Sequence, residues 1–420
     1  MQEQQQPEAA TIFTPPTPEQ VLETVRWAVA EETPLEVLGH GSKRGIGHRV
    51  EAAHVLDLSR LTGVTLYEPE ELVLSARAGT PLAEIQALLA AHNQELAFEP
   101  MDYGPLLGGE PCRGTIGGVL AANLSGPRRL KAGAARDHIL GIHAVSGRGE
   151  AFKSGGRVVK NVTGYDLAKG LAGSWGTLAV VTDVTFKVLP AAETEKTLLL
   201  NGLDDHTAAE AMAAAMGSSA EVSGAAHLPE GVIAKFLGRA LVGGAKTALR
   251  VEGFAPSVEY RIDLLARLLR SYGPAEVLET EQSRQLWREV RDCHPFVDGT
   301  PAPVWRVSVA PTTGPRLLDT FRRAAGINAY YDWQGGLIWM RMEADPEAEL
   351  LRKLIVHFGG GHATLIRAPV AVREAVDVFQ PQPPQLAALS ARLKEQFDPK
   401  NIMNPGRMVR PGQHPERTHD

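Results

Sequence analysis

Three glycine-rich segments are the part of this sequence whose residue types and spacing are best suited to chemistry. The first occupies residues 39–47 and reads Gly-His-Gly-Ser-Lys-Arg-Gly-Ile-Gly. Successive main-chain amides in such a loop can form a concave nest for a pyrophosphate, and glycine lets the backbone come close to it. A Rossmann site is rejected, because Arg44 replaces the third glycine of G-x-G-x-x-G and a strand is expected next instead of a helix. The alternative is a plain turn between two strands. The residues expected to bind are Gly39, His40, Gly41, Ser42, Lys43 and Gly45.

The second segment, residues 114–126, is dominated by small side chains and contains the run Thr-Ile-Gly-Gly. That composition suits close approach to a large flat ligand. The alternative is the start of a helix packed tightly against a neighbouring backbone. The candidate binding residues are Thr115, Ile116, Gly117, Gly118, Ala121, Ala122, Asn123, Ser125 and Gly126.

The third segment, residues 158–182, taken alone is better explained by a helix and a turn that lead into a buried strand. Its β-branched run at residues 178–189 ends at Pro190, as a strand would. The candidate binding residues here are Lys160, Gly164, Asp166, Gly176, Val180 and Val181.

Together, and in this order along the chain, the three segments resemble the FAD-binding domain of the vanillyl-alcohol-oxidase or PCMH type. The resemblance implies a domain of two small subdomains with the first loop cradling the pyrophosphate of FAD between them. It implies that the Thr-Ile-Gly-Gly segment lines the flavin and its phosphates, and that the start of the last strand contacts the adenine end. Some relatives bind FAD covalently through a histidine. Aligning the glycines puts Ser42, not His40, at that position, so we predict non-covalent FAD.

Further motifs extend the resemblance over residues 18–408. Arg-Val-Val-Lys-Asn at 157–161, Gly-His-Ala-Thr at 361–364, Phe-Asp-Pro at 397–399 and Asn-Pro-Gly-Arg-Met at 404–408 are similar to the FAD-binding subunits of glycolate oxidase. The resemblance implies an oxidoreductase acting on CH–OH groups that takes part in glycolate catabolism. It also implies that glycolate is oxidised to glyoxylate together with a catalytic flavoprotein subunit and an iron–sulfur subunit. The exact 2-hydroxy acid, the electron acceptor and the subunit stoichiometry are left open.

Whether this chain has catalytic residues of its own is a separate question. Catalytic relatives carry H-x-G-D-G-N-x-H in the cap domain, whereas the corresponding hairpin at residues 332–339 keeps Gly335 and Gly336 and has no histidine. We therefore assign no catalytic residue. Two alternatives stay open: a self-sufficient FAD-dependent 2-hydroxy acid dehydrogenase, and a non-catalytic scaffold subunit.

A cluster of basic residues and a pair of histidines have ordinary structural explanations as well as functional ones. Four basic residues follow the second segment, and they predict either a solvated loop or a surface for phosphate or an acidic partner: Arg128, Arg129, Lys131 and Arg136. His357 and His362 flank a glycine run, which indicates the end of a helix and then a strand rather than a metal pair, so no metal site is expected.

Composition limits the remaining choices. The chain has 420 residues and a net charge of −6, so nothing global indicates nucleic acid. Its two cysteines cannot by themselves supply the roughly four thiolates of an iron–sulfur cluster or of a four-cysteine zinc site. No apolar run reaches the roughly 18 residues of a membrane span, and residues 1–10 lack a secretory pattern. We expect a cytoplasmic protein, with membrane association through the complex left open.

The hydrophobic pattern predicts an α+β protein. Residues 1–17 and 409–420 are expected to be disordered tails, residues 18–190 the FAD-binding domain, and residues 191–408 a cap domain with a C-terminal return segment. The cap is expected to be an antiparallel sheet with helices on one face, and residues 330–342 read as a hairpin around Gly335-Gly336. Thr80 is expected to cap a helix with Pro81 at its first position.

Overall fold

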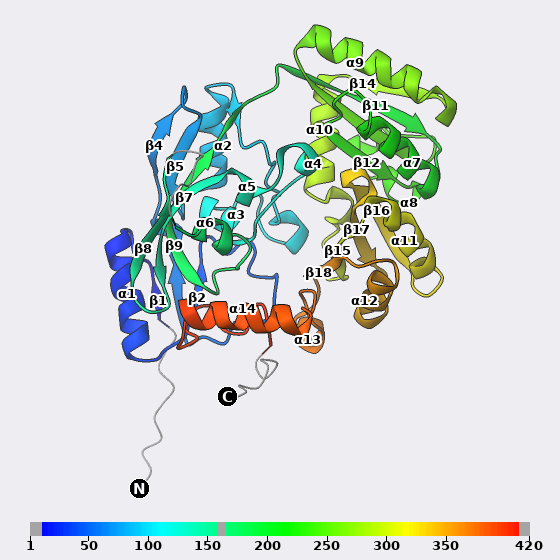
Figure 1. Cartoon of the computed structure of the whole chain (residues 1–420). Coiled ribbons are helices and arrows are strands. Elements are labelled where there is room, and N and C mark those ends of the chain that lie inside the picture. Colours follow the sequence, from blue (N-terminus) through cyan, green and yellow to red (C-terminus); the bar gives the residue numbers. More distant parts are fainter. Residues whose placement is uncertain (1–10, 158–163, 411–420) are drawn as a thin grey trace.

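The computed structural model describes residues 11–157 and 164–410, which form two lobes placed side by side (Figure 1). A small sheet of three strands and a larger sheet of five lie in the first lobe, and an eight-stranded sheet lies in the second. Every strand pairing within the two larger sheets is antiparallel. The mixture of helices with antiparallel sheets confirms the α+β class, and we retain as a proposal the division of the chain near residue 190.

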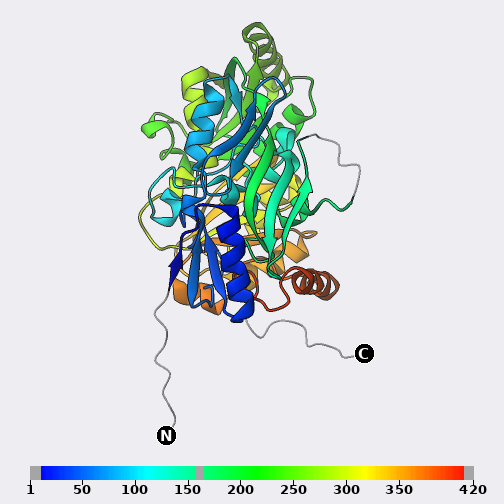
Figure 2. The same cartoon turned by 90° about the vertical axis from the view of Figure 1, so that its left-hand side faces the viewer.

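The small sheet holds the strand that leads into the first glycine loop. Its order is β1 (Ile12–Phe13), β3 (His54–Asp57) and β2 (Leu35–Leu38), all parallel. Helix α1 (Pro18–Ala30) begins where the Thr17 side chain accepts a hydrogen bond from the Gln20 amide, and it lies beside these strands (Figure 2). The side chains of α1 that share a buried core with the sheet are Val21, Val25 and Ala28.

The five-stranded sheet carries the helices that surround the second glycine segment. Buried residues of α2 and α3 share one core with those of β5, β7 and β9, so these helices pack on the sheet. The strand order is β4 (Val64–Glu68), β5 (Val73–Arg77), β9 (Ala179–Lys187), β7 (Ile139–Ser146) and β8 (Ala151–Gly155). The other elements of this lobe are α2 (Leu82–Ala90), β6 (Gln94–Glu95), α3 (Ile116–Ala121), α4 (Arg129–Ala132), α5 (Ala135–His138), α6 (Leu167–Leu171) and β10 (Leu189–Pro190).

The eight-stranded sheet has helices on both faces, which differs from the prediction of helices on one face. Helices α7 (Asp205–Met216), α9 (Ala255–Leu268), α11 (Gly314–Arg322) and α12 (Ala348–His357) cover the outer face. Helix α10 (Thr280–Arg291) packs on the inner face, because its Leu286, Trp287 and Val290 belong to the core shared with the first lobe. The strand order is β14 (Ala275–Leu278), β11 (Thr194–Asn201), β13 (Lys246–Gly253), β12 (Gly224–Leu228), β16 (Ile327–Asp332), β17 (Leu337–Met342), β15 (Val304–Ser308) and β18 (His362–Arg367). Two short helices complete the second lobe, α8 (Glu230–Ile233) and α13 (Val370–Ala375).

The C-terminal segment returns to the first lobe. Helix α14 (Pro384–Phe397), red in Figures 1 and 2, lies against that lobe, where Lys394 Nζ donates to the Thr177 carbonyl oxygen at 2.7 Å. Beyond the helix, the Leu35 amide donates to the Ile402 carbonyl oxygen at 2.8 Å. This return brings residues near 404 beside β2 and the first glycine loop.

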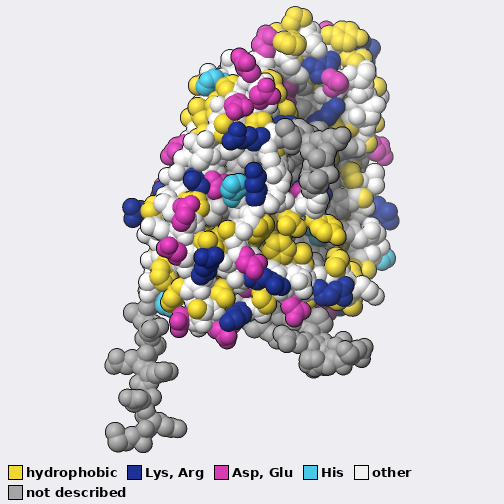
Figure 3. Space-filling view, turned by 60° about the vertical axis from the view of Figure 1, so that its left-hand side comes forward, with side chains coloured by type: hydrophobic (Ala, Val, Ile, Leu, Met, Phe, Trp, Pro, Cys, Tyr) yellow, Lys and Arg dark blue, Asp and Glu magenta, His cyan; other side chains and the backbone are white. Residues whose placement is uncertain are grey.

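The outward side of α14 is apolar. Figure 3 shows a group of hydrophobic side chains on the lower part of the face that it draws. On α14 itself, Leu386, Leu389 and Leu393 are exposed, and none of its residues is fully buried. Among the helices of the described residues, none is both long enough and apolar enough to cross a membrane.

Three local predictions are corrected by the structure. The predicted disorder is wrong for residues 11–17, because β1 pairs with β3, and for Arg410, which forms an ion pair with Asp377; residues 1–10 and 411–420 lie outside the described residues. Thr80 does not cap α2, since its hydroxyl instead donates to the Arg77 carbonyl oxygen at 2.7 Å. The hairpin prediction is confirmed by β16 and β17, which pair in antiparallel register.

A buried network of charges joins the two lobes. Arg250 on β13 has a side chain only 1% exposed and donates to both carboxylate oxygens of Glu99 at 2.9 and 3.0 Å. Arg128 donates to Glu95 at 2.8 Å and to both oxygens of Glu252. Burial opposes the ionisation of Glu99, but Arg128 and Arg250 hold its pKa below the usual value. The sequence left open a solvated loop, a phosphate site or an interface with an acidic partner for Arg128. The structure shows it instead in ion pairs within the chain.

Glu99→Gln should destabilise the protein strongly, since it removes one charge of a buried network and leaves Arg250 without the carboxylate that accepts two of its hydrogen bonds. A loss of about 3–5 kcal/mol is expected, measured as a lower midpoint of urea unfolding. Glu349→Gln is the matched control, because Glu349 pairs with Lys353 on the surface and should change stability by less than about 0.5 kcal/mol. Equal midpoints for the two variants would contradict the structural role of the network.

Candidate cofactor-binding site

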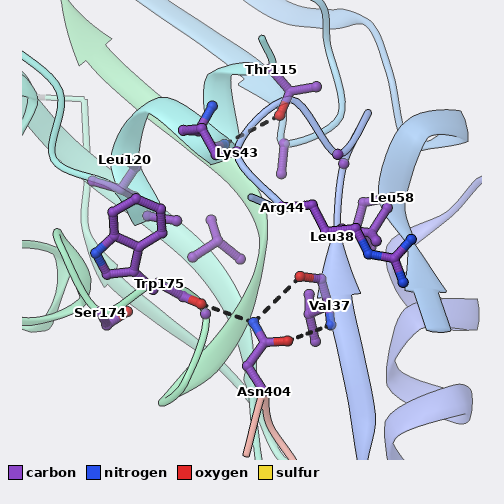
Figure 4. Close-up of a pocket in the computed structure, with 18 of the residues that line it drawn as sticks. Val37, Leu38, Lys43, Arg44, Leu58, Thr115, Leu120, Ser174, Trp175 and Asn404 are labelled. Atoms are coloured by element: carbon purple, nitrogen blue, oxygen red, sulfur yellow. Dashed lines mark hydrogen bonds between the residues drawn. The ribbon is translucent and has the colours of Figure 1, made fainter. Parts of the chain in front are cut away.

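A cavity lies where the first glycine loop, the start of α3, the turn before β9 and the C-terminal return segment meet (Figure 4). It encloses about 880 Å³ of atom-free space, part of which is open to solvent. The structure brings together at its wall many of the residues predicted from sequence. These are Gly39, His40, Gly41, Ser42, Lys43, Thr115, Gly117, Gly118, Ala121, Gly176 and Val181.

The first two glycine segments touch each other. A Cβ atom added to Gly39 would lie 2.8 Å from Thr115 Oγ1, and one added to Gly117 would lie 2.7 Å from Ala78 Cβ. Thr115 caps α3 by accepting a hydrogen bond from the Gly118 amide at 3.2 Å. Gly41 has a φ of +71°, a left-handed conformation that glycine adopts without strain. Glycine is therefore required here by close packing and by backbone conformation.

Several predicted residues lie elsewhere. Ile116 and Val180 are completely buried in the two cores of the first lobe. Gly126 packs against the Glu99 backbone, and Asp166 caps α6 by accepting from the Lys169 amide. Lys160 falls outside the described residues. The predicted residues that line neither this cavity nor the adjoining one are Gly45, Ile116, Ala122, Asn123, Ser125, Gly126, Gly164, Asp166 and Val180.

The cavity wall carries two cations that lack a full set of partners. Burial, aided by the charge of Arg407 and opposed by Asp102, lowers the pKa of Lys43 to about 8. Burial likewise lowers the pKa of Arg407 to about 10, against the attraction of Glu36. Lys43 Nζ reaches only Ser42 Oγ, at 3.3 Å, and Arg407 Nε has no hydrogen-bond partner among the described residues. Partly desolvated positive charge of this kind favours an anionic ligand.

His40 adds a further orphaned polar atom. Its Nδ1 is buried and has no hydrogen-bond partner among the described residues, although the side chain lines the cavity. Because buried polar atoms are rarely left unpaired, this nitrogen is available to a ligand. The glycine cradle, the two cations and this imidazole together fit the pyrophosphate of a dinucleotide.

Sequence reasoning missed the contribution of the C-terminal segment. Asn404 Oδ1 accepts from the Val37 amide at 2.7 Å, and its Nδ2 donates to the Trp175 carbonyl oxygen at 2.8 Å, so Asn404 ties β2 to the turn before β9 (Figure 4). Arg407 lies over the Trp175 ring, 5.7 Å from its centroid, and donates to the Lys43 carbonyl oxygen at 2.7 Å. The Asn-Pro-Gly-Arg-Met motif at residues 404–408 is visible in the sequence, but the sequence does not indicate which cavity it lines. Arg44, which the sequence suggested could face the pyrophosphate, also lines the cavity. The other lining residues that were missed are Glu36, Val37, Leu38, Leu58, Ala78, Leu120, Leu171, Ser174 and Ala179.

A second cavity adjoins the first and shares Ser42 and Lys43 with it. It encloses about 1,090 Å³, part of it open to solvent. Its walls come from both lobes, with Met101 and Tyr103 from the first and Arg291 of α10 from the second. The two cavities therefore provide an extended space that starts at the glycine cradle and ends between the lobes.

Comparison with known proteins agrees with this geometry. A family model described as an FAD binding domain matches residues 9–155. Glycolate oxidase subunit GlcE of Escherichia coli (strain K12) is 32% identical over 388 residues, which is 92% of this chain and 96% of that protein. Glycolate oxidase subunit GlcD of Bacillus subtilis (strain 168) is 45% identical over 85 residues, covering 20% of this chain and 18% of GlcD.

Among solved structures, p-cresol methylhydroxylase with substrate bound has a TM-score of 0.68 at 15% identity, covering 96% of this chain and 90% of that chain. At that identity the likeness concerns the fold, and it confirms the predicted PCMH-type architecture. The match to the FAD binding domain confirms FAD as the cofactor. The similarity to GlcE extends through both lobes, so it is not limited to the cofactor domain. The chain therefore belongs to the glycolate oxidase GlcE family of PCMH-type FAD-linked oxidoreductases.

Proposed function

We propose that this chain is the FAD-binding subunit of a complex that oxidises glycolate, or a closely related 2-hydroxy acid, to the 2-oxo acid. The observation that carries the proposal is the similarity to glycolate oxidase subunit GlcE along both lobes, combined with an intact glycine cradle. Bound FAD would supply a two-electron acceptor. The chain's own residues bind and orient that cofactor and limit the access of water to it.

The residues around the first cavity have distinct parts in this proposal. Main-chain amides of residues 39–42 would donate to the diphosphate, and Lys43 and Arg407 would offset its charge. Asn404 holds the cavity wall together and positions the Trp175 turn. We propose that FAD is held non-covalently, because Ser42 stands where some relatives carry the histidine that bonds the flavin.

The partners in this proposal are a catalytic flavoprotein subunit and an iron–sulfur subunit. GlcD, whose name marks it as another glycolate oxidase subunit, shares sequence with this chain and is the model for the first partner. The two cysteines are far apart in the sequence, and Cys293 is buried while Cys112 is exposed. A cluster that requires roughly four thiolates would therefore be supplied by the other partner.

The test of the proposed function is removal of this chain from its native complex. Extracts of the native host that lack the chain should lose glycolate-dependent reduction of an artificial electron acceptor, and the wild-type chain should restore it. The complex should also co-purify with the tagged chain together with bound flavin. Full glycolate oxidation in extracts without the chain would overturn the proposal.

Gly117→Ala should reduce FAD binding. The added Cβ would meet the Cβ atom and the carbonyl oxygen of Ala78 at 2.7 and 2.8 Å, which must push α3 away from β5 and deform the cradle. Gly114→Ala, in the same segment, is the matched control, because its Cβ would meet only Leu82 at 4.0 Å. Flavin absorbance per chain after desalting is the measurement. Equal flavin content in the two variants would show that the close contact of α3 is not needed.

Lys43→Gln should weaken FAD binding and change its dependence on pH. A charge-assisted hydrogen bond contributes about 1.5–3 kcal/mol, so the dissociation constant at pH 7 should rise by roughly 10- to 100-fold. Because the pKa of Lys43 in the free protein is lowered to about 8, the wild-type chain should bind FAD progressively less tightly as the pH rises above that value. Below it the lysine is already charged, and the affinity should be level.

The measurement is fluorescence titration of the apoprotein with FAD from pH 6.5 to pH 9.5. In Lys43→Gln, the dissociation constant for FAD should stay constant above pH 8. Lys353→Gln is the control, since Lys353 is a surface residue of α12 that is 71% exposed. A wild-type profile in Lys43→Gln would exclude Lys43 from the diphosphate site.

A further inference from the structure

Three basic side chains from both lobes lie near one another where the lobes meet. Arg306 lies on β15 and His362 on β18, where Ser308 pairs with His362 and Arg306 pairs with Thr364. Side chains two residues apart on a strand share a face, so Arg306 and His362 lie on the same side of the sheet. That side is opposite Trp305 and Val307, which are buried in the core of the outer helices, and so it faces the first lobe. Arg129 of α4 approaches from that lobe.

The two arginines meet on one indole ring. The Arg306 guanidinium carbon lies 4.9 Å from the centroid of Trp333, and the Arg129 guanidinium carbon lies 5.4 Å from it. Trp333 is held in place because its Nε1 donates to the carbonyl oxygen of Gly126 at 2.9 Å. Guanidinium groups stack well on indole, but stacking leaves their N–H donors free in the plane.

Acidic neighbours compensate these basic groups only in part: Asp137 acts on Arg129 and Asp332 on Arg306 without forming an ion pair. Throughout residues 11–157 and 164–410, none of the three forms an ion pair or a side-chain hydrogen bond. The acid that interacts with Arg306 is Asp332, and burial raises its pKa to about 7 while its carboxylate accepts from the Trp333 amide. Burial, and then the charges of Arg306 and Arg129, lowers the pKa of His362. The whole chain has a net charge of −6, but the charge at this place is locally positive. Such a local positive charge favours the binding of an anion.

Aromatic side chains lie between the basic cluster and the second cavity. Tyr103 lines that cavity and packs against Trp339, with ring centroids 6.5 Å apart. Trp339 pairs with Arg306 across β15 and β17, so its side chain lies on the same face of the sheet as Arg306. Tyr103 and Arg306 also influence the pKa of each other, which places the phenol next to the guanidinium. Aromatic rings thus separate the basic cluster from the cavity shared with the cofactor site.

We propose that Arg129, Arg306 and His362 form a binding site for the carboxylate of a small organic acid, so that this chain holds a substrate-type ligand of its own. A planar carboxylate can accept two parallel N–H bonds from a guanidinium, and the imidazole supplies a further donor or acceptor. The rings of Trp333 and Trp339 would contact the apolar part of the ligand. The inference rests on the proposed function, because it places an acid of the glycolate class beside the flavoprotein's cofactor space.

The test is calorimetric titration of the FAD-loaded chain with oxalate, an unreactive dicarboxylate, and with glycolamide, the uncharged amide of glycolate. Oxalate should bind and glycolamide should not. Arg306→Met should weaken oxalate binding by about 10-fold or more, and Arg306→Lys should restore part of it. Arg316→Met is the matched control, since Arg316 lies over Phe358 on the outer helices and should leave oxalate binding unchanged. Thermal unfolding of each variant shows whether a loss of oxalate binding is due to misfolding. If Arg306→Met misfolds, Arg129→Met is tested in its place.

Flavin absorbance per chain is recorded in the same samples, which separates this inference from the proposed function. Normal flavin content without oxalate binding in the wild type would overturn the carboxylate site and leave the proposed function intact. Oxalate binding of wild-type strength in both arginine variants would overturn it as well. Oxalate binding by a chain that takes up no FAD would instead overturn the proposed function.

Discussion

The buried ion network between Glu99, Arg128, Arg250 and Glu252 is the constraint on which the arrangement of the two lobes depends. Glu99 and Arg128 belong to the first lobe, whereas Arg250 and Glu252 lie on β13 of the second. Such a network stabilises only if every member is paired, because an unpaired charge at this depth costs several kcal/mol. The network thereby holds the lobes in one relative position. The shape of the cavity between the lobes depends on that position.

The same network positions groups that could act on a ligand. Arg128 directly precedes Arg129, so fixing the first residue aims the second toward Trp333. Gly126, two residues earlier, packs against the Glu99 backbone and accepts the Trp333 N–H. The segment between the second glycine motif and α4 therefore has a structural role, even though the sequence predicted that Ser125 and Gly126 would contact the cofactor.

The sequence predicted those features that are encoded locally. Each glycine loop could be recognised because its chemistry lies in adjacent residues, and the β16–β17 hairpin followed from a short glycine turn between apolar runs. Contacts between distant segments could not be predicted in this way. Arg407 bonds to the Lys43 carbonyl across 364 positions of sequence, and no periodicity or spacing records that pairing. For the same reason, the sequence could not show that Arg128 pairs with a carboxylate rather than with a phosphate. Its partner Glu252 lies 124 residues later in the chain.

The cations of the network between the lobes and those of the two candidate anion sites differ in how far acidic neighbours compensate their charge. Arg128 and Arg250 are surrounded by carboxylates, and these neighbours raise the pKa of each guanidinium against the effect of burial. Lys43, Arg407, Arg129 and Arg306 are also desolvated, but burial prevails and lowers their pKa values because acidic neighbours are too few. A folded chain keeps such unpaired cations at the expense of its own stability, and a bound anion would recover that loss. Of these four cations, Lys43 and Arg407 line the glycine cradle, where a diphosphate would be held, and Arg129 and Arg306 lie in the basic cluster between the lobes, where a carboxylate would be held.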